Sequence, residues 1–415
     1  MTLAERDKAV VWHPYTPQKY SADPIPVVKG DGVYLFDTNG KTYIDAISSW
    51  WVTIHGHANQ YIAEKIYQQA CNLEQVIFAG FTHEPAVQLA EKLLQMLPGY
   101  PARVFYSDNG STAVEVAVKM GLQYWWNQGI TTRNKVLALT HSYHGDTFGA
   151  MSISERSVFT RAFEDKLFDV IFIDVDDDRE LPWNEIACFI YEPLLQGAGG
   201  MKMYAPELLN RLLKQCHAHK VICIADEVMT GFGRTGKLFA SMYVEEKPDI
   251  ICLSKGLTGG AMALGVTTCT QKIHSAFVHD DKTKTFFHGH SFTANPLACA
   301  AAVASLELLL KPACLEQIER IAKMHKAFLT ELSHAHVKNK RALGTILAFE
   351  IDNGADGYLN TVKERVTAMA LEQGVYLRPL GNTVYVMPPY CITKEELRKI
   401  YNTILNILDS FLPPD

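Results

Sequence analysis

The sequence lacks a long apolar run and a concentration of positive charge. Its longest apolar stretch, Leu297–Leu310, is interrupted by Ser305 and Glu307, and it is shorter than the roughly 20 residues of a membrane-spanning helix. The 39 Lys and Arg residues are outnumbered by 45 Asp and Glu residues, which gives a net charge of −6, and they form no basic cluster. Nucleic acids and anionic membranes bind basic patches, so we expect no nucleic-acid partner and no membrane.

Disulfide and secretion signals are missing as well. None of the nine cysteines is part of a Cys-x-x-Cys pair. Most lie in apolar runs such as Val221–Ala225, where a reduced thiol behaves as a small hydrophobic side chain. Residues Met1–Ala9 are charged and contain no apolar core of a signal peptide. Unpaired cysteines are typical of a reducing compartment, and we expect a cytoplasmic protein.

The middle of the chain alternates short apolar segments with helical patterns. The apolar segments predict strands at Val104–Tyr106, Val136–Leu139, Val170–Ile173, Cys188–Tyr191, Val221–Ala225 and Ile250–Leu253. Helical patterns such as Thr112–Trp126 and Ala205–His219 lie between them. Short strands that are apolar on both faces are typical of a mostly parallel sheet flanked by helices. We therefore predict an α/β fold, whose ligand site lies at the carboxyl ends of the strands.

The two ends of the chain differ from this middle part. Residues 1–59 are rich in Pro, Gly and aromatic residues, and Asn39-Gly40 between the strand-like segments Val33–Phe36 and Thr42–Asp45 predicts a hairpin. Beyond about residue 312 the pattern predicts strands and helices at Ala342–Ile351, Val362–Gln373, Val375–Arg378, Val384–Met387 and Lys394–Phe411. We expect a large domain over residues 60–310 and a small α+β domain over residues 311–415. The N-terminal arm and hairpin (1–59) would belong to the small domain.

Two neighbouring strand ends carry the residues of a covalent site. The segment Val221–Ala225 leads into Asp226, and Ile250–Leu253 leads into Ser254 and Lys255. An amine at the end of a buried strand loses contact with water, which lowers its pKa and suits it to forming a Schiff base. An Asp on a nearby strand end is placed to pair with a pyridinium N–H. Taken alone, Asp226 also fits a solvated strand-terminal acid.

A further strand end suits a phosphate. The predicted strand Val104–Tyr106 leads through Gly110 and Ser111 into a helix. Backbone N–H groups and the helix dipole at such a start favour a phosphate, although the same residues also suit a helix cap without a ligand. Tyr143, in the loop after Val136–Leu139, is a candidate for stacking on an aromatic ring, and loop tyrosines also serve as packing residues.

Two other motifs are weak. Gly231–Gly236 matches the Gly-x-Gly-x-x-Gly pattern of dinucleotide-binding folds, but Asp226–Thr230 separate it from its strand and no clear helix start follows. Among the His-x-His pairs are those at positions 55/57, 217/219 and 288/290, and there is no His-Glu-x-x-His motif. Scattered polar or capping histidines explain these pairs more simply than a metal does. We therefore expect neither a dinucleotide site nor a metal site.

Longer motifs show a family resemblance. The segment Asp226–Gly236, followed by Ser254–Gly260, resembles the motifs of the class III, fold-type I aminotransferases, and the similarity extends over essentially the whole chain. The resemblance implies a large domain with a mostly parallel sheet flanked by helices, a small α+β domain, and pyridoxal 5′-phosphate (PLP) as the cofactor. It also implies a homodimer with shared active sites.

The resemblance assigns roles at the cofactor. Lys255 would hold PLP as a Schiff base and move the catalytic proton, and Asp226 would pair with the pyridine nitrogen. Gly110 and Ser111 would bind the phosphate, and Tyr143 would lie beside the ring.

It also assigns roles at the substrate. Trp51 and Tyr143 would wall the substrate cleft, and Arg378 would bind a keto-acid carboxylate by a bidentate pair. Tyr15, as a catalytic residue, would reach the amine side of the substrate and influence which amino compound reacts. Gly289, His290 and Ser291 would approach the phosphate and the substrate from the partner subunit. The family often has Pro-Thr where this chain has His290-Ser291, so the imidazole there has no assigned role.

Within the family, one branch is the most similar. The segments that resemble the aminotransferases of biotin synthesis are Trp12–Thr16, Ser48–Trp51, Tyr143–Met151, Glu192–Met201, Arg378-Pro379 and Val386–Tyr390. This implies transfer of an amino group from S-adenosylmethionine to 8-amino-7-oxononanoate, giving 7,8-diaminononanoate. Two alternatives stay open: lysine as the donor, and another class III ω-aminotransferase acting on ornithine or a simple ω-amine. A PLP-binding regulator would need a DNA-binding extension, for which the N-terminal segment is too short.

Overall fold

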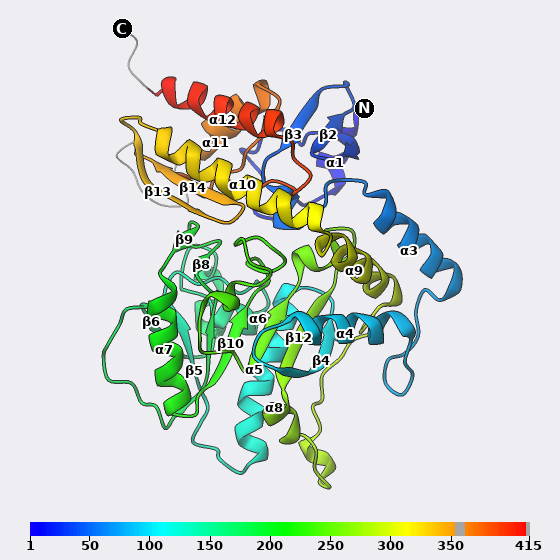
Figure 1. The fold of residues 1–415 in the computed structure, drawn as a ribbon, viewed down its shortest axis with the longest axis vertical. Coiled ribbons are helices and arrows are strands. Elements are labelled where there is room, and N and C mark those ends of the chain that lie inside the picture. The colour runs from blue at the N-terminus through cyan, green and yellow to red at the C-terminus, as the bar shows by residue number, and fades with distance from the viewer. Residues whose placement is uncertain (353–361, 412–415) are drawn as a thin grey trace.

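A seven-stranded sheet forms the centre of the computed structural model, which describes residues 1–352 and 362–411 (Figure 1). Its strands, in spatial order, are β4 (Pro101–Ser107), β12 (Gly265–Thr270), β11 (Ile250–Leu253), β10 (Ile222–Asp226), β7 (Ile186–Tyr191), β5 (Lys135–Leu139) and β6 (Val170–Ile173). Neighbours from β11 to β6 run parallel, and β12 is antiparallel to both β11 and β4. The predicted α/β fold with a mostly parallel sheet is confirmed.

Strand β10 shows why these strands are apolar on both faces. Successive side chains of a strand point to opposite faces of its sheet. Ile222 and Ile224 pack in one apolar cluster with α5 (Gly110–Asn127), whereas Cys223 and Ala225 pack in another with α7 (Pro206–Ala218). Both faces of the sheet are therefore covered by helices.

The remaining helices and short strands surround this sheet. The helices are α1 (Leu3–Val10), α2 (Ser48–Trp51), α3 (Gln60–Asn72), α4 (Glu84–Met96), α6 (Phe148–Ser152), α8 (Gln271–Ser275) and α9 (Pro296–Leu309), with 3-10 turns η1 (Arg161–Lys166), η2 (Ala240–Tyr243), η3 (Lys255–Thr258) and η4 (Lys282–Lys284). A small ribbon pairs β8 (Leu195–Gln196) with β9 (Lys202–Met203).

The N-terminal hairpin and the C-terminal part of the chain share a sheet. Strands β1 (Val27–Asp31), β2 (Tyr34–Asp37) and β3 (Thr42–Asp45) are extended by β15 (Val375–Tyr376), which runs parallel to β3. A second sheet contains β13 (Val337–Leu343), β14 (Ile346–Ile351) and β16 (Thr383–Val386), near α10 (Pro312–Glu331), α11 (Val362–Glu372) and α12 (Lys394–Asp409). These elements lie together above the central sheet in Figure 1. The domain limits at residues 59 and 310 stay predictions, and residues 353–361 and 412–415 of the predicted small domain lie outside the described residues.

One predicted strand was wrong. Ala342–Ile351 is not one strand, because the chain turns at Gly344 and Thr345 and folds β14 back on β13. Gly344 has φ +57°, and a Cβ there would lie 2.1 Å from the carbonyl carbon of Thr235. The turn therefore needs glycine.

Among the described residues no single helix is long and apolar enough to cross a membrane, and α9 and α10 meet that test only as a pair bent by 70°.

Candidate active site

The carboxyl ends of the parallel strands open into a cavity of about 720 Å³. Its lining includes residues at or just beyond the ends of four strands: Tyr143 in the loop after β5, Glu192 directly after β7, Asp226 at the end of β10 and Lys255 shortly after β11. The start of α5 lines the same cavity. The structure thus brings Lys255, Asp226, Gly110, Ser111, Tyr143 and Trp51 to one site, as the sequence predicted.

Lys255 is the second residue after β11, following Ser254, and has a left-handed φ of +48°. Its Nζ lies 4.5 Å from the centroid of the Trp51 ring. Burial lowers the pKa of Lys255 to about 8, although the nearby carboxylates of Asp226 and Glu192 oppose that shift. Near neutral pH a fraction of this amine is therefore unprotonated and nucleophilic.

Asp226 is held by hydrogen bonds to both carboxylate oxygens. The backbone N–H of Val228 donates to Oδ1 at 3.0 Å, and His144 Nδ1 lies 2.7 Å from Oδ2. Because a carboxylate only accepts, the proton of the imidazole belongs on Nδ1. His144 is buried, and its Nε2 has no hydrogen-bond partner among the described residues. Sequence reasoning missed this residue, since only the fold brings the loop after β5 to the end of β10.

Glu192 is a second buried acid at the site to which the sequence assigned no role. Its Oε1 accepts from the N–H of Tyr143 at 3.1 Å, and its Oε2 accepts from the N–H of Gly197 at 2.9 Å. Burial raises the pKa of Glu192 to about 7, against the effect of His144. This carboxyl group therefore orients the Tyr143 loop and titrates near neutral pH.

The beginning of α5 fits a phosphate group. The first helical hydrogen bond is donated by Ala113 to the carbonyl of Asn109, so the N–H groups of Gly110 and Ser111 precede it and remain available to an anion. A Cβ at residue 110 would lie 2.7 Å from Val228 Cγ1, and one at Gly145 would lie 1.8 Å from Ser111 Oγ. The backbone around this helix start is therefore open only because both positions are glycine.

An aromatic cluster closes one side of the cavity. Tyr15 Oη lies 3.2 Å from Tyr143 Oη and donates to the carboxylate of Asp146. Burial raises the pKa of Tyr143, and Tyr15 and Asp146 raise it further. Trp51 Nε1 donates to Tyr385 Oη at 3.0 Å, which fixes the indole beside Lys255. Tyr15 comes from the N-terminal arm and does not itself line the cavity; it contacts Tyr143 and Asp146, which do.

The remaining predicted residues lie outside the 720 Å³ cavity. Arg378 lines a separate hollow of about 500 Å³ with Trp50 and Tyr376, and its guanidinium lies 4.6 Å from the centroid of the Trp50 ring. Gly289, His290 and Ser291 lie between η4 and α9 and do not line the cavity of this chain. Their predicted contribution from a partner subunit stays a prediction.

Comparison with known proteins agrees with this geometry. The family model described as aminotransferase class-III matches residues 15–408. The adenosylmethionine-8-amino-7-oxononanoate aminotransferase of Synechococcus elongatus is 47% identical over 96% of this chain and 98% of that protein. The crystal structure of the enzyme of that name from Methanocaldococcus jannaschii has a TM-score of 0.93 at 34% identity, and 98% of each chain is covered. The omega transaminase of Pseudomonas jessenii in complex with PMP also has a TM-score of 0.93, at 26% identity over 99% of this chain and 98% of that chain.

The family model matches most of the chain, and one cavity brings together the Lys255 amine, the Asp226 carboxylate and the start of α5. Together these findings assign the family. This chain is an enzyme that belongs to the class-III aminotransferase family, whose members depend on PLP.

Proposed function

We propose that this enzyme transfers the amino group of S-adenosylmethionine to 8-amino-7-oxononanoate, giving 7,8-diaminononanoate in biotin synthesis. The observation that carries the proposal is that Tyr143 and Trp51 line the cavity of Lys255, with Trp51 against the Lys255 amine and Tyr15 in contact with Tyr143. Relatives named for this reaction, at 47% and 34% identity over nearly the whole chain, support it.

The residues of the cavity fit PLP. The N–H groups of Gly110 and Ser111 would bind its phosphate, Asp226 its pyridine nitrogen and Lys255 its aldehyde carbon. When bound, the cofactor draws electrons from the carbon that loses or gains a proton. His144 fixes Asp226 through Oδ2 at 2.7 Å and so keeps the carboxylate aimed at the pyridine nitrogen.

Lys255 moves the proton. With PLP held in the cavity, Nζ would be the base that takes the proton from the substrate's amino carbon and the acid that returns it during the amino-group transfer. A pKa of about 8 suits an amine for both directions near neutral pH. The indole of Trp51, 4.5 Å away, limits where the amine can swing.

The acceptor is bound at its two ends. Arg378 would bind the carboxylate in the 500 Å³ hollow, while the keto carbon lies near Lys255. Trp50 lines that hollow and Trp51 lines the cavity. A long aliphatic chain between carboxylate and keto group satisfies both sites, and 8-amino-7-oxononanoate has such a chain.

A homodimer would complete the site. Gly289, His290 and Ser291 do not reach the cavity of their own chain, and the neighbouring Phe287 and Phe292 are 73% and 63% exposed. Apolar rings that are exposed in one chain are suited to cover by a second chain. The three residues would then approach the phosphate and substrate of the partner's site.

A spectral titration tests the donor. Adding S-adenosylmethionine alone to the PLP-loaded enzyme is expected to convert its absorbance to that of the aminated cofactor. Lysine, ornithine and a simple ω-amine are added in parallel. If lysine converts the cofactor and S-adenosylmethionine does not, lysine is the donor. If ornithine or the ω-amine converts it and S-adenosylmethionine does not, the enzyme is another class III ω-aminotransferase.

A further inference from the structure

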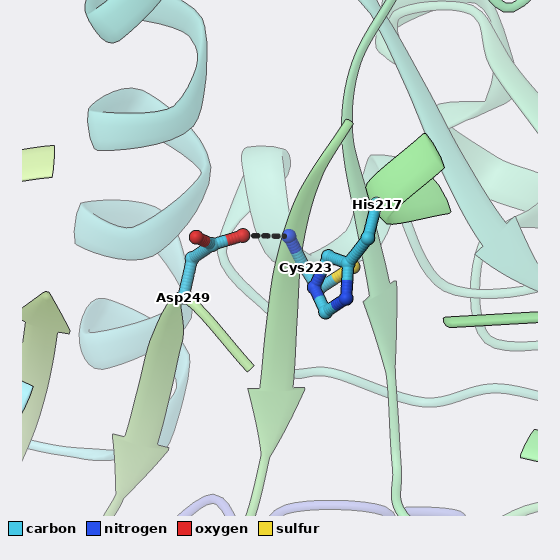
Figure 2. Close-up of side chains that lie close together, drawn as sticks. All are labelled: His217, Cys223 and Asp249. Carbon is cyan, nitrogen blue, oxygen red and sulfur yellow. Dashed lines mark hydrogen bonds between the residues drawn. The ribbon is translucent and has the colours of Figure 1, made fainter. Parts of the chain in front are cut away.

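A cluster of metal-ligating side chains lies at the opposite end of β10 from Asp226. His217 is in the last turn of α7, Cys223 is the second residue of β10, and Asp249 directly precedes β11. Figure 2 shows their side chains converging from these elements. One ligand atom from each lies within 4.8 Å of those of the other two. The spacing in sequence pointed away from a metal, because the donors come from separate segments.

The contacts hold each donor in position. Asp249 Oδ2 accepts from the backbone N–H of Cys223 at 3.0 Å, the bond drawn in Figure 2. The other oxygen of Asp249 lies 3.3 Å from the half-exposed Lys272 ammonium. His217 Nδ1 lies 2.7 Å from a carboxylate oxygen of Glu246.

We propose that His217, Cys223 and Asp249 form a binding site for Zn²⁺. An imidazole, a thiolate and a carboxylate are the ligand types that Zn²⁺ takes, at bonds of about 2.0–2.3 Å. Such bonds place tetrahedral ligand atoms about 3.3–3.8 Å apart, so donor atoms that lie within 4.8 Å of one another need to close by roughly 1.5 Å or less. Water supplies the fourth ligand.

The contact between His217 and Glu246 is the independent sign of a metal site. Metal-bound histidines usually donate their other ring N–H to a carboxylate, which orients the ring and makes it more basic. With Nδ1 engaged by Glu246, Nε2 is the nitrogen left for the metal. Binding replaces the thiol proton of Cys223 by the cation, so metal binding releases protons.

The site has an entry path and is separate from the active site. The side chains of His217 and Glu246 are 30% and 32% exposed, whereas Cys223 is buried. A cation therefore enters from the α7 side and reaches the thiol last. Cys223 is near the amino end of β10 and Asp226 is at its carboxyl end, so Zn²⁺ contacts no residue of the cofactor site.

Calorimetric titration of the PLP-loaded enzyme with Zn²⁺, in a buffer that does not coordinate metals, tests the proposal. We expect one ion per subunit. Cys223→Ala and His217→Ala should weaken the Kd by more than roughly 100-fold, and Glu246→Gln by roughly 10–100-fold. The matched controls are Cys299→Ala, another buried free thiol, and His219→Ala, the histidine two positions along; both should keep the wild-type Kd.

X-ray absorption of the zinc-loaded enzyme identifies the donors. Wild type should show one sulfur at about 2.3 Å from the metal, and Cys223→Ala should show none. No stoichiometric binding, or a Zn²⁺ Kd that Cys223→Ala and His217→Ala leave unchanged, would overturn the proposal. The side chain of Glu246 is 32% exposed, so Glu246→Gln provides a second test of the site should the variant at the buried Cys223 fail to fold.

Discussion

Replacing Arg378 by Gln should weaken the binding of the keto acceptor, 8-amino-7-oxononanoate, and leave the reaction with the amino donor unchanged. The guanidinium is partly buried, stacks at 4.6 Å on Trp50, and has no ion-pair partner among the described residues. Losing one member of a desolvated charge pair costs about 2–5 kcal/mol. Because water still reaches Arg378, we expect the lower end, about 2 kcal/mol, which corresponds to a roughly 30-fold weaker acceptor.

The two half-reactions separate this effect from a general loss of structure. In single-turnover mixing, the PLP-loaded variant should react with S-adenosylmethionine at the wild-type rate. The variant that carries the aminated cofactor should need about 30-fold more 8-amino-7-oxononanoate to reach its half-maximal rate. Arg378→Lys should recover only part of the loss, because an ammonium lacks the planar fork of a guanidinium, and the surface variant Arg211→Ala should behave as wild type. A donor half-reaction slowed as much as the acceptor half-reaction would refute the assignment of Arg378 to the carboxylate.

The other predictions concern the cofactor residues and one turn. Lys255→Ala should abolish turnover and the absorbance of covalently bound PLP, and a retained band would identify another lysine as the anchor. The rate at which the apoenzyme captures PLP should rise with pH around a midpoint near 8, since only the unprotonated amine attacks and burial lowers the pKa of Lys255 to about 8; a midpoint above 10 would contradict this. His144→Phe should weaken PLP binding by about 1.5–3 kcal/mol, because Asp226 loses a hydrogen bond and a hydrogen bond to a charged group is worth about that much. It should appear as a roughly 10–150-fold weaker PLP Kd in equilibrium dialysis, and an unchanged Kd would mean that His144 only packs. Gly344→Ala should lower the free energy of unfolding by at least about 1–3 kcal/mol in urea titration, because φ is +57° and the new Cβ meets backbone at 2.1 Å; an unchanged midpoint would show that the turn adapts.

That Lys255 and Asp226 lie at the same site could be predicted, because the position of each depends on local sequence. Each residue ends an apolar strand, and neighbouring parallel strands place their carboxyl ends at one edge of the sheet. The structure confirms that both line one cavity. His144 and Glu192 could not be found this way. Their importance comes from contacts with Asp226 and the Tyr143 loop, and nothing in the loop sequences indicates which residues those loops meet.

Arg378 marks another limit of local sequence. It belongs to a segment that follows β15, and β15 is placed by pairing with β3 from the other end of the chain. A strand of two residues has no periodicity from which its partner could be inferred. The position of the Arg378 guanidinium relative to Lys255 therefore depends on packing between the N-terminal and C-terminal segments, and not on a motif around residue 378.

Strand β12 determines the span of the cofactor site, and the sequence analysis did not predict it. Its Gly-Val-Thr-Thr-Cys-Thr sequence contains three threonines, so it lacks the continuous apolar character of its neighbours. It lies between β4 and β11, and two strand spacings of about 4.8 Å each separate the strand before the phosphate loop from the strand before Lys255. Thr267 Oγ1 donates to the carbonyl of Ala113 at 2.7 Å, which fastens the first turn of α5 across that gap. The threonine that makes β12 hard to recognise thus helps to set the distance between the start of α5 and Lys255.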